Sequence, residues 1–134
     1  MTMHSYLRID GVPGGSVDSG YEGWIACDSV SWSLRGAAPA GGYSEIRFVK
    51  LEDSASPLLA RLCLAETPVA AAHFDFLRVD AQGERVKCYE IALENLLVAN
   101  VATAHLHESA PTETVVLRFA NATLTHSGQE DDPG

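Results

Sequence analysis

Apolar and polar residues alternate along most of this sequence, and this period-two pattern is typical of β-strands that bury one face. The longest such segment, 22–35, predicts one long strand. Its expected buried face comprises Trp24, Ala26, Val30, Trp32 and Leu34. Asp28 falls on the same face, so we expect either a β-bulge at this position or a partner for its carboxylate.

The rest of the chain shows the same alternation between breaks that are rich in turn residues. Further strands are expected over 6–10, over 43–51, from 69 to a hairpin turn at 80–84, over 88–101 and over 115–125. The breaks between them lie at 11–20, 36–42 and 105–112. The segment 88–101 is either one very long strand or two strands joined by a kink near Asn95.

One short helix is expected before residue 69. Ser56 is suited to the N-cap and Pro57 to the first helical position. The helix should end near Glu66, shortly before Pro68. Its apolar stripe comprises Leu58, Leu59, Leu62 and Cys63.

These elements predict an all-β, mainly antiparallel fold: a closed or nearly closed β-barrel with one short helix on its side. Closure is expected because it removes the exposed strand edges of an all-β protein. The length of 134 residues suits one hydrophobic core, so we expect a single domain over 1–127. Residues 128–134 are expected to form an acidic, disordered tail.

Charge and composition narrow the classes of partner. Acidic residues outnumber basic residues 18 to 9, and the net charge of −9 opposes binding to nucleic acid or anionic lipid. No apolar run has the length of a membrane span, and Met1–Tyr6 lacks the pattern of a signal peptide, so we expect synthesis in the cytoplasm and no membrane insertion.

Because Cys27, Cys63 and Cys88 are odd in number and widely spaced, we interpret them as reduced, structural thiols.

Two pairs of residues could form binding sites. Trp24 and Trp32 could make an aromatic platform for a ligand, but same-face aromatics on a barrel strand are expected to fill the interior. His105 and His107 would point the same way on an extended chain, as a metal-ligating pair does. No third ligand is evident near them, because the remaining histidines are remote in sequence: His4, His73 and His126. A solvated loop is therefore expected, with no metal and no cofactor.

No arrangement typical of an enzyme is found. None of the serines lies in a nucleophile elbow. Glu90 and Glu94 are four residues apart on a strand, which is far for a coupled acid and base, so we expect them to line a polar face. A glycine-rich turn, formed by Gly11, Gly14 and Gly15, is not followed by a helix that could help to bind phosphate. We predict no catalytic residues and no enzymatic activity.

The order and spacing of several short motifs resemble the haemolysin-coregulated protein (Hcp) family of the type VI secretion system. The first group is Tyr6–Ser16, followed by Asp18, Gly20, 23–25 and 31–32. The resemblance continues through 48–50, 56–58, 90–95, 97–98 and 113–120, and so covers nearly the whole chain.

This resemblance implies a β-barrel similar to the tail-tube proteins of long-tailed bacteriophages. It implies assembly into hexameric rings that stack into an inner tube and carry effectors in the lumen, with spike and sheath proteins as further partners. It also implies secretion by sheath contraction without a signal peptide. In many members a long loop between the second and third strands engages the next ring, whereas here only Gly36–Gly42 occupies that place. Rings are therefore expected more readily than tubes. The alternative is a monomeric β-barrel that binds a small ligand.

Overall fold

The alternating segments form one seven-stranded antiparallel sheet in a computed structural model that describes residues 2–36 and 43–127. The strands are β1 (Met3–Ile9), β2 (Ile25–Cys27), β3 (Ser29–Ser33), β4 (Ser44–Leu51), β5 (Val69–Val79), β6 (Arg85–Ala104) and β7 (Thr112–His126). Their order across the sheet is β2-β1-β5-β6-β7-β4-β3. The expected tail at 128–134 and most of the break at 36–42 lie outside the described residues.

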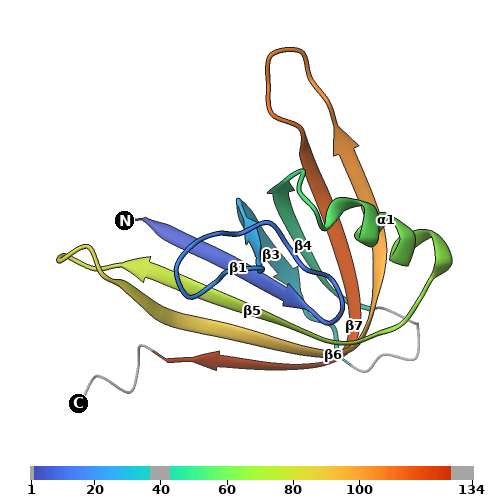
Figure 1. Ribbon diagram of the computed structural model, residues 1–134. Helices are drawn as coiled ribbons and strands as arrows, with labels where there is room; N and C mark the ends of the chain where they lie inside the picture. The colour runs from blue at the N-terminus through green and yellow to red at the C-terminus, as the bar shows by residue number, and fades with distance from the viewer. Residues whose placement is uncertain (1, 37–42, 128–134) are drawn as a thin grey trace.

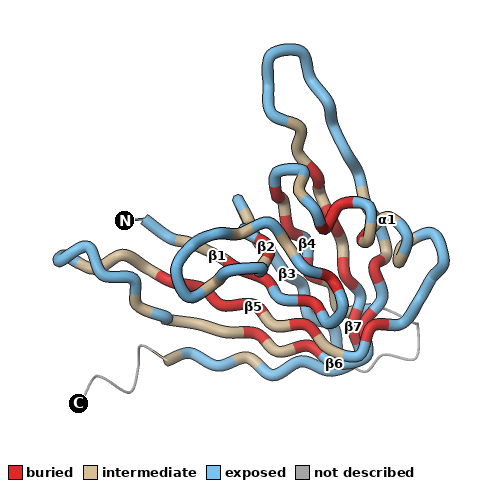
Figure 2. The backbone as a smooth tube through the Cα atoms, in the orientation of Figure 1, coloured by how far each residue is buried: buried red, intermediate tan, exposed pale blue. Residues whose placement is uncertain are grey.

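The sheet is strongly curled into a half-barrel, as Figure 1 shows. The two longest strands, β6 and β7, bend around its base, and α1 (Ser56–Ala65) lies beside them. Buried residues follow the inside of the curl, while the long loop after β1 and the outer ends of the strands are exposed (Figure 2). The expected all-β, antiparallel fold with one short helix is confirmed for the described residues.

Apolar side chains from all parts of the sheet fill the inside of the half-barrel. Leu7 of β1, Phe48 of β4, Phe74 of β5 and Leu117 of β7 have no solvent exposure. Burial of such side chains contributes about 1.5–3 kcal/mol each, and it is the main force that holds the curled sheet together. An interior filled in this way favours a packed core over the ligand cavity of the alternative interpretation.

The predicted single strand over 22–35 is in fact two short strands, β2 and β3, separated by one residue, Asp28. The Asp28 N–H donates to the Val49 carbonyl at 2.7 Å, and the alternation of inward and outward residues shifts by one at this break. Ile25 and Cys27 face the core before it, and Val30 packs against the core after it. Asp28 is exposed, so its carboxylate needs no buried partner, and the expected bulge within one strand is instead a break between two strands that pair with different neighbours.

This break also carries the chain from one edge of the sheet to the other. The strand β2 pairs with β1, whereas β3, which follows immediately, pairs with β4 at the opposite edge of the sheet order. The curl of the sheet brings these two edges near each other, because one residue spans the gap between them.

The helix begins one residue earlier than its sequence indicates. Ala55 occupies the N-cap position without a side-chain cap, and Ser56 and Pro57 lie inside the first turn. The predicted N-cap at Ser56 is therefore wrong, because its hydroxyl bonds outside the helix, to Asp53, Lys50 and Glu113. The predicted end at Glu66 is confirmed: this residue is left-handed, with φ 51°, and its N–H donates to the Cys63 carbonyl.

The segment around Asn95 belongs to one uninterrupted strand of 20 residues, β6. Asn95 has φ 56°, a local distortion that asparagine tolerates better than most residues, and the pairing register with β7 is the same on both sides of it.

The predicted hairpin turn at 80–84 is also present, with Gly83 at φ 82° and the Asp80 N–H donating to the Glu84 carbonyl.

The connection between β6 and β7 projects beyond the rest of the molecule (Figure 1). The residues from Ala102, near the end of β6, to Ala110 are exposed, and the last pair that β4 makes with β7 is Leu51 with Thr112. Past this point the hairpin has no neighbouring strand among the described residues. We call residues 102–112 the projecting hairpin.

Candidate functional site

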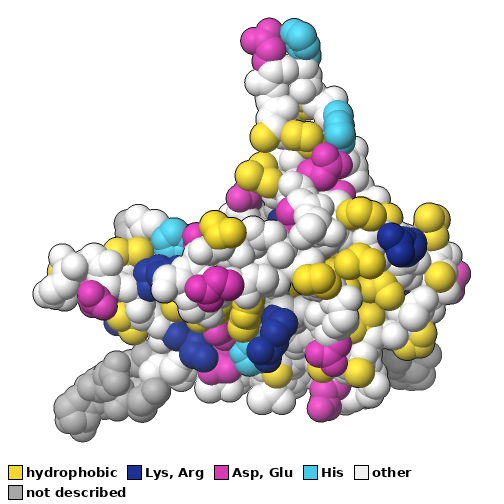
Figure 3. Space-filling model, in the orientation of Figure 1, with side chains coloured by type: hydrophobic (Ala, Val, Ile, Leu, Met, Phe, Trp, Pro, Cys, Tyr) yellow, Lys and Arg dark blue, Asp and Glu magenta, His cyan; other side chains and the backbone are white. Residues whose placement is uncertain are grey.

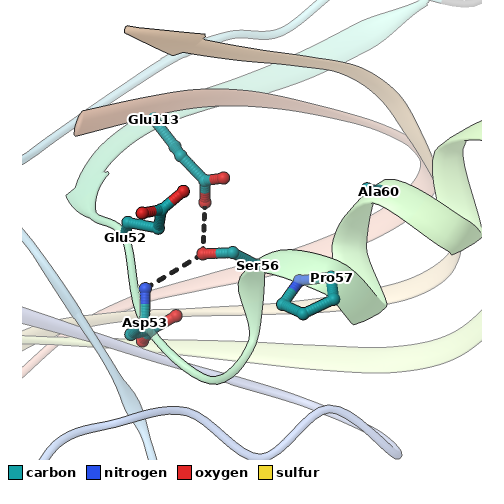
Figure 4. Close-up of a pocket in the computed structure, with 6 residues that line it drawn as sticks. All are labelled: Glu52, Asp53, Ser56, Pro57, Ala60 and Glu113. Atoms are coloured by element: carbon teal, nitrogen blue, oxygen red, sulfur yellow. Dashed lines mark hydrogen bonds between the residues drawn. The ribbon is translucent and has the colours of Figure 1, made fainter. Parts of the chain in front are cut away.

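A buried ionic junction joins β4, α1 and β7 at the base of the projecting hairpin. Figure 4 draws three of its members, Asp53, Ser56 and Glu113. The Lys50 ammonium lies 2.8 Å from the Glu113 carboxylate and 2.8 Å from Asp53, and the lysine side chain has no solvent exposure. Ser56 completes the junction: its Oγ accepts from Lys50 at 2.9 Å and donates to Glu113 at 2.8 Å. Each charged group therefore has a partner, as burial of charge requires.

The hydrogen bonds of the junction decide the ionisation of Glu113. Burial opposes the charged form and is the largest single influence on this carboxyl group. Hydrogen bonds from Lys50, Ser56 and Thr103 act together in the other direction and hold the pKa of Glu113 below its usual range. The carboxylate is thus charged at neutral pH and pairs with Lys50.

A cavity of about 590 Å³ opens beside this junction. It is lined by Glu52, Asp53, Ser56, Pro57, Ala60 and Glu113, and Figure 4 shows the Ser56 hydroxyl directed toward Glu113. The proton of this hydroxyl is donated to Glu113, and its oxygen accepts from Lys50 and from the Asp53 N–H at 2.9 Å. Ser56 is therefore a structural connector and is poorly placed to act as a nucleophile.

A second polar layer covers the outer face of β1 and β5, beneath the loop from Asp10 to Trp24. Tyr6 and Tyr21 stack with ring centroids 4.3 Å apart. The Tyr6 hydroxyl donates to Asp18, and Tyr21 donates to Asp75 at 2.8 Å. Arg85 closes the layer by donating to the Tyr6 hydroxyl at 3.0 Å and to the Ser19 carbonyl at 2.6 Å.

Burial and hydrogen bonding keep both of these tyrosines protonated. Burial, followed by the hydrogen bond to Asp18, raises the pKa of Tyr6 to about 12. Burial and the hydrogen bond to Asp75 raise the pKa of Tyr21 as well. The layer holds the long loop against the sheet. The sequence pattern did not predict it, because the side chains that bond Tyr6 are 12 and 79 residues away in the chain.

The prediction that Trp24 and Trp32 share one face and fill the interior is wrong, because the break between β2 and β3 at Asp28 turns them to different faces. Trp24 lies on the outer layer, with Arg8 5.0 Å above its ring. Trp32 stacks on Tyr89 at 5.8 Å at the mouth of the half-barrel, where 38% of it remains exposed. The two rings do not form a common platform.

The other candidate residues lie apart from one another. His105 binds Glu52 at 3.0 Å, and His107 binds its neighbour Glu108 at 3.1 Å, so the two histidines have different partners. Glu90 is half-buried among charged residues of the outer face, and Glu94 is exposed further along β6. The structure thus places both glutamates on a polar face.

The glycine-rich turn has a steric reason. A Cβ atom on Gly14 would lie 2.4 Å from the Trp24 carbonyl oxygen. Any residue other than glycine at position 14 would therefore prevent the loop from lying this close to the start of β2. The Gly15 N–H donates to Asp53 at 3.1 Å, which ties this turn to the buried junction.

The three cysteines, Cys27, Cys63 and Cys88, are free thiols, and burial raises the pKa of Cys27 to about 12.

One cluster was missed by the sequence analysis. His73 Nε2 lies 2.9 Å from Asp75 Oδ1 and 3.2 Å from Glu90 Oε1. Asp75 and Glu90 are directly paired residues of β5 and β6. The alternation on 73 and 75 places both side chains on one face, but the pairing with residue 90 depends on strand register, which a single sequence does not specify.

None of the helices in the described part of the chain is long and apolar enough to cross a membrane.

Comparison with known proteins agrees with this architecture. The model of a family described as "Type VI secretion system effector, Hcp" matches residues 6–126. This match covers most of the chain, and the protein therefore belongs to the Hcp family of type VI secretion proteins. The resemblance noted in the sequence is confirmed.

Solved structures share the fold. Hcp1 from Salmonella typhimurium has a TM-score of 0.83 at 24% identity, with 94% of this chain and 86% of that chain covered. A type VI secretion system effector from Yersinia pestis has a TM-score of 0.78 at 23% identity, with coverage of 94% and 92%. Hcp3 of Pseudomonas aeruginosa has a TM-score of 0.77 at 18% identity, with coverage of 93% and 91%. Among curated protein sequences, none matches this chain.

Proposed function

We propose that this protein is a structural subunit of the type VI inner tube, which assembles into hexameric rings and carries effectors through the ring lumen. The observation that carries the proposal is the family match over residues 6–126. A packed interior and a serine whose hydroxyl is fully engaged support a structural role without catalysis. The protein would be made in the cytoplasm as a single domain over 1–127 and secreted by sheath contraction, with spike, sheath and effector proteins as partners.

The proposed working form is a barrel closed at Asp28. The single-residue step between β2 and β3 supports closure, because the edge that pairs with β1 and the edge that pairs with β4 are continuous in the chain. Closure would leave few free strand edges for uncontrolled pairing. Subunits would then associate through defined surfaces.

The projecting hairpin is the surface that we assign to contacts between subunits. It extends away from the core, and its apolar tip residue, Leu106, is 67% exposed. The junction of Lys50, Ser56 and Glu113 holds its base rigidly, and a rigid element loses less conformational entropy on association. Heterologous contacts of this kind generate closed rings when the rotation between neighbours closes.

Projection images of the purified protein test this proposal. Sixfold rings are expected for the wild-type chain, and Leu106→Asp should reduce the ring fraction at equal protein concentration. The matched control is Leu64→Asp on the outer side of α1, where the leucine is 85% exposed and the cost of the charge to the monomer is similarly small. If rings persist in Leu106→Asp and disappear in Leu64→Asp, the interface lies on the helix and the assignment to the projecting hairpin is wrong.

A further inference from the structure

The outer face of β5 and β6 carries three potential metal ligands whose donor atoms converge. His73 Nε2, Asp75 Oδ1 and Glu90 Oε1 form the cluster, and their ligand atoms lie within 4.8 Å of one another. Asp75 is buried, with 7% of its side chain exposed, and His73 and Glu90 are half-buried at 25% and 27%. In Figure 3, acidic, basic and histidine side chains gather over this region of the sheet.

The two separations from the His73 imidazole fit neighbouring positions of a coordination shell. With metal–ligand distances of about 2.1 Å, neighbouring ligand atoms are about 3.0 Å apart in octahedral and about 3.4 Å apart in tetrahedral geometry. The separations from His73 Nε2 are 2.9 Å to Asp75 Oδ1 and 3.2 Å to Glu90 Oε1. A divalent ion could therefore replace the hydrogen bonds of the cluster with little movement of the backbone.

The electrostatics of the cluster also favour a cation. Asp75 and Glu90 are directly opposed on neighbouring antiparallel strands, and like charges in this position repel each other. Lys87 offers partial compensation, with its ammonium 3.7 Å from Asp75 and 3.5 Å from Glu90, but 41% of its side chain is exposed. A divalent ion between the carboxylates would compensate both charges more directly than this exposed ammonium.

Surrounding side chains hold the ligands in place. The Tyr21 hydroxyl donates at 2.8 Å to Asp75 Oδ2, the oxygen that does not face His73. The Trp24 ring packs edge-on against His73 with centroids 6.2 Å apart, which limits rotation of the imidazole. Such outer contacts orient metal ligands and strengthen binding.

From this arrangement we infer that His73, Asp75 and Glu90 form a binding site for a divalent transition-metal ion. One imidazole nitrogen and two carboxylate oxygens suit Zn²⁺, Co²⁺ or Mn²⁺. Lys87 is the internal counter-ion that the metal displaces. The site lies on the loop-covered face of the sheet and involves no residue of the projecting hairpin, so metal binding and ring assembly are separable properties.

The two tryptophans of the chain provide a direct assay. In a Trp32→Phe variant without a histidine tag, Trp24 is the remaining tryptophan, and it contacts His73. Titration with Co²⁺ should quench its fluorescence saturably, at one ion per chain. Isothermal titration of Zn²⁺ into the wild-type chain provides an independent measurement that does not depend on the Trp32 substitution.

Variants of the ligands and their surroundings make the assignment specific. Asp75→Asn and Glu90→Gln should each weaken binding by at least about tenfold, and Tyr21→Phe by roughly tenfold. The matched controls are Glu94→Gln on the same strand and His107→Ala on the projecting hairpin, neither of which should change the affinity. Lys87→Met should tighten binding several-fold, because the competing ammonium is removed.

A stoichiometry of one with this pattern of variants supports the site. Absence of saturable binding by both methods at millimolar ion overturns it, provided that circular dichroism confirms a folded chain. Binding that survives Asp75→Asn and Glu90→Gln but is lost in His107→Ala also overturns it, because it places the ion at surface histidines. Neither result bears on ring formation, which is measured separately.

Discussion

The ammonium of Lys50 lies 2.8 Å from the carboxylate of Glu113, and both side chains are almost completely buried. The two residues come from β4 and β7, 63 positions apart, and are directly paired in the sheet. Removal of one member of a buried ion pair leaves the other charge without compensation, which typically costs several kcal/mol. This pair therefore makes a strong prediction about stability.

Glu113→Gln should lower the free energy of unfolding by about 3 kcal/mol, because Lys50 keeps only Asp53 as a charged partner. Urea denaturation followed by circular dichroism measures this change. The matched control is Glu45→Gln, which removes the exposed pair with Arg118 at 3.4 Å and should change stability by less than about 0.5 kcal/mol. Equal effects of the two substitutions would contradict the buried junction.

The same carboxylate predicts how stability depends on acidity. The pKa of Glu113 is lower in the folded chain than its ordinary value of 4.5, so the stabilisation is present above that value and is lost as pH falls through the folded pKa. The wild-type chain should therefore lose more stability than Glu113→Gln when the pH is lowered from about 6 to about 3. Parallel losses in both chains would show that Glu113 does not contribute.

Tyr6 predicts a second pH effect, at the alkaline end. Its pKa is raised from 10.0 to about 12, so the associated stabilisation is present below pH 10 and is lost as pH rises toward 12. In an absorbance titration at the phenolate wavelength, part of the tyrosine signal should appear only near the alkaline unfolding transition. Tyr6→Phe should remove a share of this delayed signal; an unchanged titration would contradict the stacked layer.

Gly14 predicts a steric effect on the loop after β1. Gly14→Ala places a Cβ atom 2.4 Å from the Trp24 carbonyl oxygen and should cost about 1–3 kcal/mol of stability. Gly36→Ala is the matched control, because a Cβ atom there has no neighbour within 4 Å. Thermal unfolding of both variants measures the difference, and a neutral Gly14→Ala would mean that the loop does not approach β2 this closely.

The period-two pattern predicted most of the fold because alternation reports directly on which residues face a core. It placed most of the strands, while turn residues and Pro68 indicated the turn at 80–84 and the end of the helix; the alternation wrongly assigned Trp24 and Trp32 to one face. The break at Asp28, where the chain leaves β2 and begins β3, exchanges the faces, and no local rule specifies its position. The Ser56 hydroxyl, which looked like an N-cap, bonds instead to groups 6 and 57 residues away.

The cluster of His73, Asp75 and Glu90 shows the same limit for sites. Two of its members lie two residues apart, and the third joins them through the register of β5 with β6. Register depends on the whole sheet, so the cluster became visible only when the strands were placed. The surfaces that form the ring are harder still to predict from the sequence, because they depend on contacts between copies of the chain.

The central claim is that this chain forms rings, and the molar mass of the purified protein in solution tests it most directly. Sedimentation velocity over a range of protein and salt concentrations should show a species of six times the 14.3 kDa chain mass. A single species of 14.3 kDa under all of these conditions would contradict the account.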